Sequence, residues 1–400
     1  MQRQPFNRPP RVRPRWPSEE VALPAPPAPP ARPAAARRAQ LTPLLGASLM
    51  ASLALAGGGS WLLALPSGAM AGMGLVAALR AERASARRDA IAHAARVAFF
   101  EEQLDAAHPR LRRLYEQERS ARQHLDPEPT ELLAIAGVGS RATPDPRLWE
   151  RRPSDDDFLS LRVGLGDLPA ACRAVLPPPT ADSPLDLRLP QIAAEVTTLR
   201  QVPICLPLGQ LGSLGVAGPR PQTLALLQAL IWQATTLHAP GDLRIALAAD
   251  APGDWEWLRW LPHAVPLSNE PGHSQRMCAT SRPATARLLS DILDQISRRR
   301  ESAAQRTSPA SPRLLLVIDG EDLAGAYPAV AEIMRHGPTL GMAVIVLAGA
   351  WPQIPESCAG MLDVGPPGAR WVRAGEPWPR EAFTPDSADT SASDRLARRL

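Results

Sequence analysis

The stretch from Gly215 to Thr223 has the position and some of the residue types of a phosphate-binding loop. In an intact loop of the form G-x-x-x-x-G-K-[ST], backbone N–H groups cradle phosphate, the lysine reaches the phosphoryl oxygens and the hydroxyl binds Mg²⁺. Here Pro221 and Gln222 stand where the pattern requires glycine and lysine, and only Thr223 fits it. The two prolines of the stretch also remove two N–H donors from the cradle.

An acid at the end of an apolar strand supplies the second part of such a site. The run from Leu314 to Ile318 ends in Asp319, which has the form of a carboxylate that holds Mg²⁺, but Gly320 follows where a second acid would position water. Arg220 can contact phosphate in place of lysine, beside the positive end of the next helix. The sequence therefore predicts a degenerate nucleotide site without hydrolysis, with a purely structural turn as the alternative. The candidate residues are Gly215, Gly218, Arg220, Thr223 and Asp319.

The composition removes several kinds of chemistry. The 400-residue chain contains no lysine, so all 44 residues of the Lys/Arg class are arginine. Schiff-base catalysis and phosphate binding by a loop lysine are thereby excluded. The four cysteines lie far apart in the sequence and favour reduced thiols over a zinc site. We expect no catalytic residue, no metal and no cofactor, and the sequence leaves open whether ATP binds without hydrolysis.

Strands and helices that would position these residues alternate from residue 211 to residue 384. Continuous Leu, Val and Ile runs separated by helices are typical of a parallel sheet covered on both faces. The predicted strands are 213–217, 243–248, 276–280, 314–319 and 343–347. The predicted helices are 222–238, 255–260, 283–299 and 326–335.

The segment between Arg38 and Arg80 carries no charged residue and no histidine. It predicts two transmembrane helices, at 41–56 and 61–79, because a single helix through it would be roughly twice as long as the ~30 Å hydrocarbon core. Arginines on both outer flanks predict a multi-pass inner-membrane protein with both termini in the cytoplasm. The alternatives are a twin-arginine export signal beginning at Arg37 and a buried core hairpin.

The remaining segments divide the chain further. Residues 1–40 are predicted to be a flexible Pro/Arg-rich tail, and residues 80–126 a helical stalk that Pro109 kinks or divides. A connector with short β segments follows over 127–210, then the α/β domain over 211–384 and a flexible tail over 385–400. The acids at 155–157 are interpreted as a solvated turn, since loops that bind hard cations space their ligands.

The tryptophans and histidines of the α/β domain do not predict a functional site. For Trp255, Trp257 and Trp260 core packing is favoured over a platform on which bases stack, because no basic stripe accompanies them. His238 and His263 lack the spacing of metal ligands.

Two segments of the connector, LWERRPSD at 148–155 and DFLSLRVGLG at 157–166, resemble the signature of the EccC family. EccC proteins are the FtsK/SpoIIIE-type membrane ATPases of actinobacterial type VII secretion. Residues 238–246 (HAPGDLRIA) and 255–263 (WEWLRWLPH) also resemble that family. The fold class that the resemblance implies is α/β, with two transmembrane helices and a stalk followed by a P-loop-NTPase-like parallel sheet. In the family, tandem ATPase domains that use ATP and recognise secreted helical hairpins come after this part. They are not found in this sequence, which leaves open a fragment, a split subunit or a decayed copy.

The expected function follows from this resemblance and from the degenerate site. It is a membrane-anchored, non-catalytic subunit of a type VII (ESX) secretion complex that couples an FtsK/SpoIIIE-type ATPase to the channel. The expected partners are other membrane subunits, ATPase domains on a separate chain or lost, and further copies of the chain, without nucleic acid. The alternatives are a membrane-anchored FtsK-like DNA translocase fragment and an exported protein with a twin-arginine-like signal.

Overall fold

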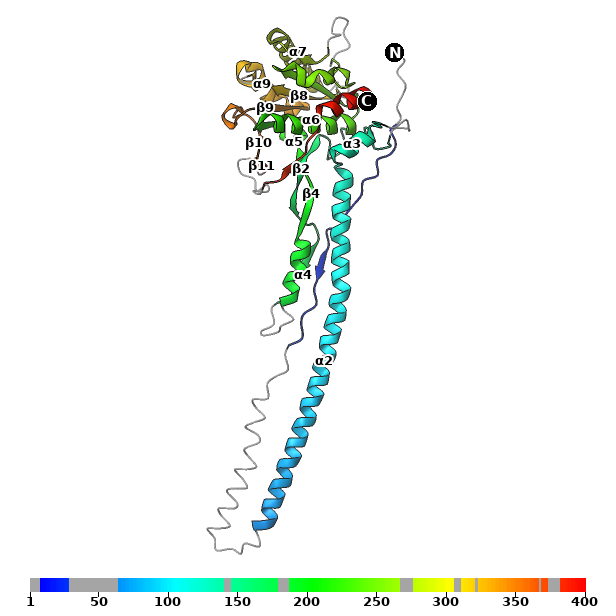
Figure 1. The fold of residues 1–400 in the computed structure, drawn as a ribbon, viewed down its shortest axis with the longest axis vertical. Coiled ribbons are helices and arrows are strands. Elements are labelled where there is room, and N and C mark those ends of the chain that lie inside the picture. The colour runs from blue at the N-terminus through cyan, green and yellow to red at the C-terminus, as the bar shows by residue number, and fades with distance from the viewer. Residues whose placement is uncertain are drawn as a thin grey trace. The chain divides into compact units, whose positions relative to one another are not determined.

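The computed structural model describes residues 8–28, 64–139, 145–178, 187–266, 276–305, 311–320, 323–366, 368–372 and 382–400 (Figure 1). The chain divides into two compact units. The first, here called the α/β unit, comprises Met1–Trp16, Gln117–Pro169 and Thr198–Leu400. The second, here called the stalk unit, comprises Pro17–Glu116 and Ala170–Thr197.

A seven-stranded sheet forms the centre of the α/β unit. Its strand order is β11-β10-β5-β9-β8-β6-β7, and every neighbouring pair is parallel except β10 with β11. The strands are β5 (Ser213–Ala217), β6 (Leu243–Ala249), β7 (Cys278–Ala279), β8 (Arg313–Asp319), β9 (Met342–Ala348), β10 (Gly360–Gly365) and β11 (Gly368–Val372). The predicted parallel α/β sheet is confirmed, but β10 and β11 were not predicted.

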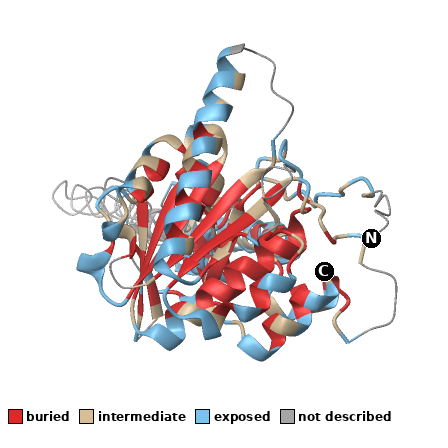
Figure 2. Cartoon of the chain, turned by 90° about the horizontal axis from the view of Figure 1, so that it is seen from above, coloured by how far each residue is buried: buried red, intermediate tan, exposed pale blue. Residues whose placement is uncertain are grey.

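Helices cover both faces of this sheet, and Figure 2 shows the buried strands between them. Along β8 the side chains alternate: Leu315 and Val317 join one core cluster, whereas Leu314, Leu316 and Ile318 join the other. This period of two is what a strand buried on both faces requires. The first cluster includes α6 (Arg220–Leu237), η3 (Pro252–Trp260) and α10 (Thr390–Arg399), and the second includes α7 (Arg282–Gln305), α8 (Leu323–Ala326) and α9 (Pro328–His336). The short helices η4 (Pro338–Leu340) and η5 (Trp351–Gln353) flank β9.

A second sheet of the α/β unit holds the connector and the C-terminal residues. Its order is β12-β2-β4, all antiparallel, with β2 (Ser160–Pro169), β4 (Thr198–Pro207) and β12 (Thr384–Pro385). The helices α3 (Pro129–Ile135) and α5 (Leu208–Leu211) flank it in the sequence. The flexible tail predicted over 385–400 is wrong, because α10 buries Leu396 and Ser393 accepts a 2.9 Å hydrogen bond from the Trp232 indole. The prediction failed because the segment is mostly polar and only one side of α10 is buried.

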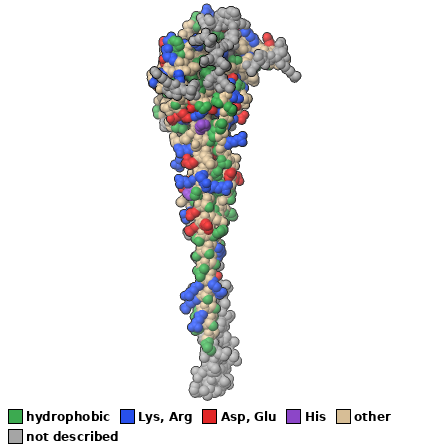
Figure 3. Space-filling model, turned by 90° about the vertical axis from the view of Figure 1, so that its right-hand side faces the viewer, with side chains coloured by type: hydrophobic (Ala, Val, Ile, Leu, Met, Phe, Trp, Pro, Cys, Tyr) green, Lys and Arg blue, Asp and Glu red, His purple; other side chains and the backbone are tan. Residues whose placement is uncertain are grey.

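The stalk unit is built around α2 (Ala64–Leu125), a helix of 62 residues that continues into the α/β unit. Pro109 lies inside α2 and does not divide it. Its buried residues Phe100, Leu104, Leu111 and Leu114 recur at spacings of four, seven and three residues, as on one face of a helix. Four arginines near its beginning form the basic group visible in Figure 3, namely Arg80, Arg83, Arg87 and Arg88.

A short parallel sheet and a helix complete the stalk unit. Strand β1 (Glu20–Ala22) pairs with β3 (Arg173–Val175), and α4 (Arg188–Thr197) follows. Val21 and Leu23 are buried. The described part of the N-terminal region, residues 8–28, is therefore built into the fold, which corrects the prediction of a flexible tail for these residues.

The predicted membrane hairpin is overturned. No helix among the described residues combines the length and the apolar character that crossing a membrane requires. The second predicted span, 61–79, coincides from Ala64 onward with the start of α2, and the charged residues that begin at Arg80 leave an apolar part shorter than the ~20 residues a span needs. The first predicted span, 41–56, lies outside the described residues. The finding contradicts both the two transmembrane helices and the multi-pass inner-membrane localisation.

Candidate nucleotide site

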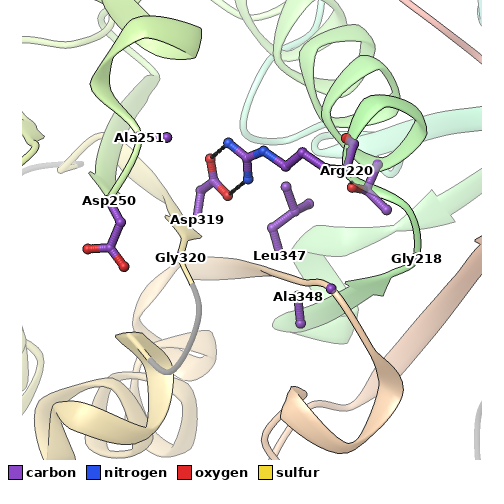
Figure 4. A pocket seen from close by; sticks show the side chains of 10 residues that line it. Gly218, Arg220, Asp250, Ala251, Asp319, Gly320, Leu347 and Ala348 are labelled. Carbon is purple, nitrogen blue, oxygen red and sulfur yellow. Dashed lines mark hydrogen bonds and ion pairs between the residues drawn. The ribbon is translucent and has the colours of Figure 1, made fainter.

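The candidate residues meet where the parallel strands end. The loop between β5 and α6 faces the carboxyl ends of β6, β8 and β9 across a pocket of about 260 Å³ (Figure 4). This edge of a parallel sheet is where α/β folds bind their ligands. Ten residues line the pocket: Gly218, Arg220, Thr223, Asp250, Ala251, Asp319, Gly320, Leu347, Ala348 and Gly349. Four of the five predicted residues are among them, and Gly215 is not.

Asp319 and Arg220 are paired with each other across this pocket. The two guanidinium nitrogens of Arg220 reach the two carboxylate oxygens of Asp319, and the Nη2–Oδ2 contact measures 2.9 Å. The Trp255 indole also donates to Oδ2 of Asp319. The Asp319 side chain is only 1% exposed. Both of its oxygens therefore have protein partners, and neither is free to bind Mg²⁺.

The Arg220 guanidinium also has protein partners for its charge. Its Nη2 lies 2.7 Å from Oδ2 of Asp254 as well. The hydrogen bond to Asp319 raises the pKa of Arg220 above its ordinary value, although partial burial opposes the rise. A guanidinium with two carboxylate partners offers little attraction to a phosphate, because its charge is already neutralised.

The backbone of the loop has few N–H groups left for a phosphate. Gly218 donates its N–H to a carbonyl of β9 at 3.3 Å. Gln222 and Thr223 both donate to the Pro219 carbonyl at 3.1 Å, and Pro219 and Pro221 have no N–H. The Thr223 hydroxyl turns back to the Pro219 and Arg220 carbonyls. The N–H groups of Gly218, Gln222 and Thr223 therefore already have protein acceptors.

The two glycines of the loop have packing reasons. Gly218 adopts φ +145°, and a Cβ there would collide with the carbonyl oxygen of Val364 in β10. Gly215 lies inside β5, where a Cβ would collide with the side chain of Ile354. Close approach of neighbouring segments explains both glycines without a ligand.

Carboxylates outnumber cations around the pocket. Asp250 lies just beyond β6 and lines the pocket, Asp254 lies in the first turn of η3, and neither was predicted as a site residue. Among the residues that the structure describes here, Asp254 and Asp319 both pair with the guanidinium of Arg220, and the Asp250 carboxylate lies beside Gly320, turned away from Arg220 in Figure 4. Asp250 follows a buried strand just as Asp319 does, so that position was a usable signal. The excess negative charge disfavours a nucleotide phosphate.

The predicted core packing is confirmed for Trp255 and Trp257 and is wrong for Trp260. Trp255 and Trp257 are 2% and 3% exposed, with ring centroids 6.2 Å apart, whereas Trp260 is 42% exposed and lies under the guanidinium of Arg398. His263 is fully buried and donates from Nε2 to the His238 carbonyl at 2.8 Å. Burial lowers the pKa of His263 to about 4. Within the described ranges no group of three or more His, Cys, Asp or Glu residues is placed to hold a metal ion.

The signature at 148–166 joins the connector to α6. Arg151 has no exposed surface and contacts Asp126 at 2.7 Å and the Leu125 carbonyl at 2.8 Å. Its backbone N–H donates to the last residue of α6, Leu237. The Trp149 indole donates to the Thr235 carbonyl at 3.0 Å. The signature is therefore a structural joint in this chain.

Comparisons with known proteins agree with the signature. The ESX secretion system protein EccC of Thermomonospora curvata is 28% identical over 329 residues, which are 79% of this chain and 23% of that protein. Of two Mycobacterium tuberculosis proteins, EccC4 of ESX-4 is 36% identical over 155 residues (36% of this chain, 12% of that protein), and EccC3 of ESX-3 is 34% identical over 224 residues (54% and 16%). This chain is a homologue of the EccC proteins. It spans less than a quarter of the length of these three relatives. No protein-family model matches it.

Solved structures of EccC and EssC proteins are also similar to the chain. The cytoplasmic domain of the Thermomonospora curvata type VII secretion ATPase EccC is 15% identical, with a TM-score of 0.44 over 67% of this chain and 34% of that one. EssC ATPases 2 and 3 from Geobacillus thermodenitrificans are 13% identical, with a TM-score of 0.43 over 64% and 51%. At these TM-scores the likeness adds nothing to the sequence relationship.

Proposed function

We propose that this chain is a component of an ESX (type VII) secretion system and that its α/β unit is an ATPase-like module that does not hydrolyse nucleotide. In this proposal the module couples an FtsK/SpoIIIE-type ATPase to the other subunits, and hydrolysis belongs to ATPase domains other than this one. The family of its homologues supports the secretion role. The geometry of the pocket supports the absence of hydrolysis.

The Arg220–Asp319 pair is the observation that carries the proposal. A magnesium–nucleotide complex would have to detach the buried Asp319 carboxylate from Arg220 before binding it. Leaving one partner of a buried ion pair unpaired costs on the order of 3 kcal/mol, which corresponds to a loss of more than a hundredfold in affinity. In this chain the site has no lysine and few free N–H donors with which to offset that cost.

The partners in this proposal are the other subunits of the secretion complex. A module that does not hydrolyse nucleotide acts through binding. Its surfaces then have to transmit force to the other subunits or hold them in position. We expect the chain to co-purify with such subunits from its native host. Recovery of the chain alone, under conditions that keep the rest of the complex together, would contradict the coupling role.

A paired substitution separates a structural pocket from a catalytic one. Arg220→Met together with Asp319→Leu removes both charges and leaves residues of similar size, a replacement that buried ion pairs often tolerate. If the pocket is structural, the double variant should fold, join the complex and support secretion as the unaltered chain does. If the pocket hydrolyses ATP for secretion, the double variant should fold and be inactive.

DNA-stimulated ATP turnover tests the translocase alternative directly. The unaltered chain should show no ATP hydrolysis above the uncatalysed background, with or without DNA, since Asp319 is held by Arg220. Turnover that rises when DNA is added, and that is lost in the double variant, would replace the present proposal with a translocase.

A further inference from the structure

The acids at 155–157 hold an arginine from the opposite end of the sequence. Arg11 directs Nη2 to Oδ2 of Asp157 at 2.6 Å and Nη1 to Oδ1 at 2.8 Å, which is a two-pronged contact. Asp155 accepts a further bond from Nη1 at 3.1 Å, and Glu150 lies 3.7 Å from Nε. The Arg11 side chain is only 6% exposed. A buried guanidinium surrounded by three carboxylates is a built binding site.

Residues on both sides of Arg11 add contacts within the same α/β unit. Arg8 lies 2.6 Å from Asp242 and also donates to the Trp149 carbonyl. The Pro9 carbonyl accepts a bond from Arg152, and the Trp16 ring lies under the guanidinium of Arg122 at 5.2 Å. Arg13 is 39% exposed and stays 3.7 Å or more from its nearest acids. Arg11 is therefore the deepest anchor of this segment.

The segment 8–16, with the sequence RPPRVRPRW, contacts the rest of the α/β unit in the way that a bound peptide ligand contacts its receptor. No part of it belongs to a helix or strand, and within the described part of the chain none of its backbone N–H groups makes a hydrogen bond. Its three prolines favour an extended chain that loses little entropy on binding. Side-chain contacts from an extended Pro/Arg peptide are a recurring mode of reversible recognition.

The receiving carboxylates are held in place by the signature itself. Asp155 accepts a bond from the Arg152 N–H at 2.9 Å, and Asp157 lies 3.6 Å from the buried Arg151. Burial alone would raise the pKa of Asp157, but the hydrogen bond from Arg11 and the charges of Arg151 and Arg11 lower it to about 2. Burial also raises the pKa of Glu150, which Arg11 counters. Neighbouring residues of the signature thus help to hold Asp155 and Asp157 in position.

We propose that Glu150, Asp155 and Asp157 form an arginine-peptide receptor, and that residues 8–16 are its reversible ligand in the same chain. The chemical class it recognises is an extended peptide with arginines three positions apart around two prolines, as in Arg8 and Arg11. The segment is then a latch that another copy of that sequence can displace. This inference does not depend on whether the pocket at Asp319 binds nucleotide.

A binding measurement in trans tests the receptor with the full-length chain. The probe is a fluorescein-labelled synthetic peptide of residues 8–16, followed by fluorescence anisotropy. In the variant Arg11→Gln the chain's own ligand is weakened, so the peptide should bind saturably and about tenfold or more tighter than it binds the unaltered chain. A peptide carrying glutamine at the position of Arg11 should bind neither protein. Adding Asp155→Asn to the Arg11→Gln chain should weaken the binding.

Limited proteolysis tests the latch in cis. Trypsin cuts at Arg15–Trp16, a bond that a docked segment presents poorly. Cleavage there should be about tenfold faster in Arg11→Gln than in the matched control Arg13→Gln, which removes an exposed arginine two residues away. Equal cleavage of the two variants would overturn the latch. Absence of saturable peptide binding to Arg11→Gln, or equal binding of the glutamine peptide, would overturn the receptor. Unchanged near-ultraviolet circular dichroism confirms that each variant is folded.

Discussion

Two aspartates of this chain each form an ion pair with an arginine, and the two ion pairs differ in which partner is buried. In the pocket the acid is the buried partner: Asp319 is 1% exposed and Arg220 is 43% exposed. At the signature the arginine is the buried partner: Arg11 is 6% exposed and Asp157 is 18% exposed. The first pair joins the start of α6 to the end of β8, whereas the second holds a segment that belongs to no helix or strand. The filled pocket and the peptide-binding site thus differ in which partner of the ion pair is buried.

A substitution in the closely packed loop before Arg220 should lower the free energy of unfolding the most. Gly218→Ala would place a Cβ against the Val364 carbonyl at φ +145°, so we expect the free energy of unfolding to fall by about 4 kcal/mol. The matched control is Gly253→Ala, where no atom lies within 4 Å of the new Cβ. Urea denaturation measures both. A neutral Gly218→Ala would mean that the glycine serves a ligand and not the fold.

Removal of the exposed partner of the filled pocket comes next. Arg220→Ala leaves the Asp319 carboxylate buried with only the Trp255 indole, and should lower the free energy of unfolding by about 3 kcal/mol. The double variant Arg220→Met with Asp319→Leu should recover most of this loss. If the single and double variants lose equal stability in urea, the ion pair is not what fills the pocket.

Acid should weaken the core well before it weakens the latch. His263 has a pKa of about 4 in the folded chain and about 6.5 unfolded, so the unfolded chain binds more protons between these values and the free energy of unfolding falls by about 3 kcal/mol from pH 6.5 to pH 4. Asp386, with its pKa raised to about 6 by burial, opposes part of this fall, because the folded chain takes up that proton first.

The latch responds differently to the same titration. Because the pKa of Asp157 is lowered to about 2, its contribution is present above about pH 3.8 and is lost only as the pH falls through 2. Urea denaturation between pH 7 and pH 4 should show the loss from His263, which should be reduced in His263→Asn and retained in the half-exposed control His336→Asn.

Weakening the latch should have the smallest effect on the free energy of unfolding. Arg11→Gln should lower the free energy of unfolding by only about 1 kcal/mol, because Asp157 keeps its contact with Arg151 and partial access to water. Arg13→Gln should have no measurable effect. A loss from Arg11→Gln as large as that from Arg220→Ala would mean that residues 8–16 are part of the core and cannot act as a displaceable ligand.

How far the sequence predicted the molecule depends on the distance between interacting residues. The β5 strand was predicted with its observed bounds, and β6, β8 and β9 within one residue, because continuous apolar runs report burial on both faces. The strand β10, GMLDVG, was missed because its glycines and aspartate are typical of turns. The membrane hairpin was predicted from apolar composition and is contradicted by the helices of the described chain.

The candidate site was located correctly in the sequence, but its pairing was not. The loop around Arg220 and the acid Asp319 each have a local signal, yet their contact joins residues 99 positions apart. The partner of Asp157 lies 146 positions away, in a segment whose proline content indicates flexibility. Ion pairs between distant segments leave no periodicity in a single sequence, so the filled pocket and the latch become visible only in the structure.

Isothermal titration calorimetry of the full-length chain with Mg·ATP tests the central claim most directly. With Asp319 held by Arg220, the titration should give no saturable heat at nucleotide concentrations of about 1 mM, and the Arg220→Met, Asp319→Leu variant should behave identically. Saturable binding with a dissociation constant of about 10 μM or tighter, lost in that variant, would contradict the account.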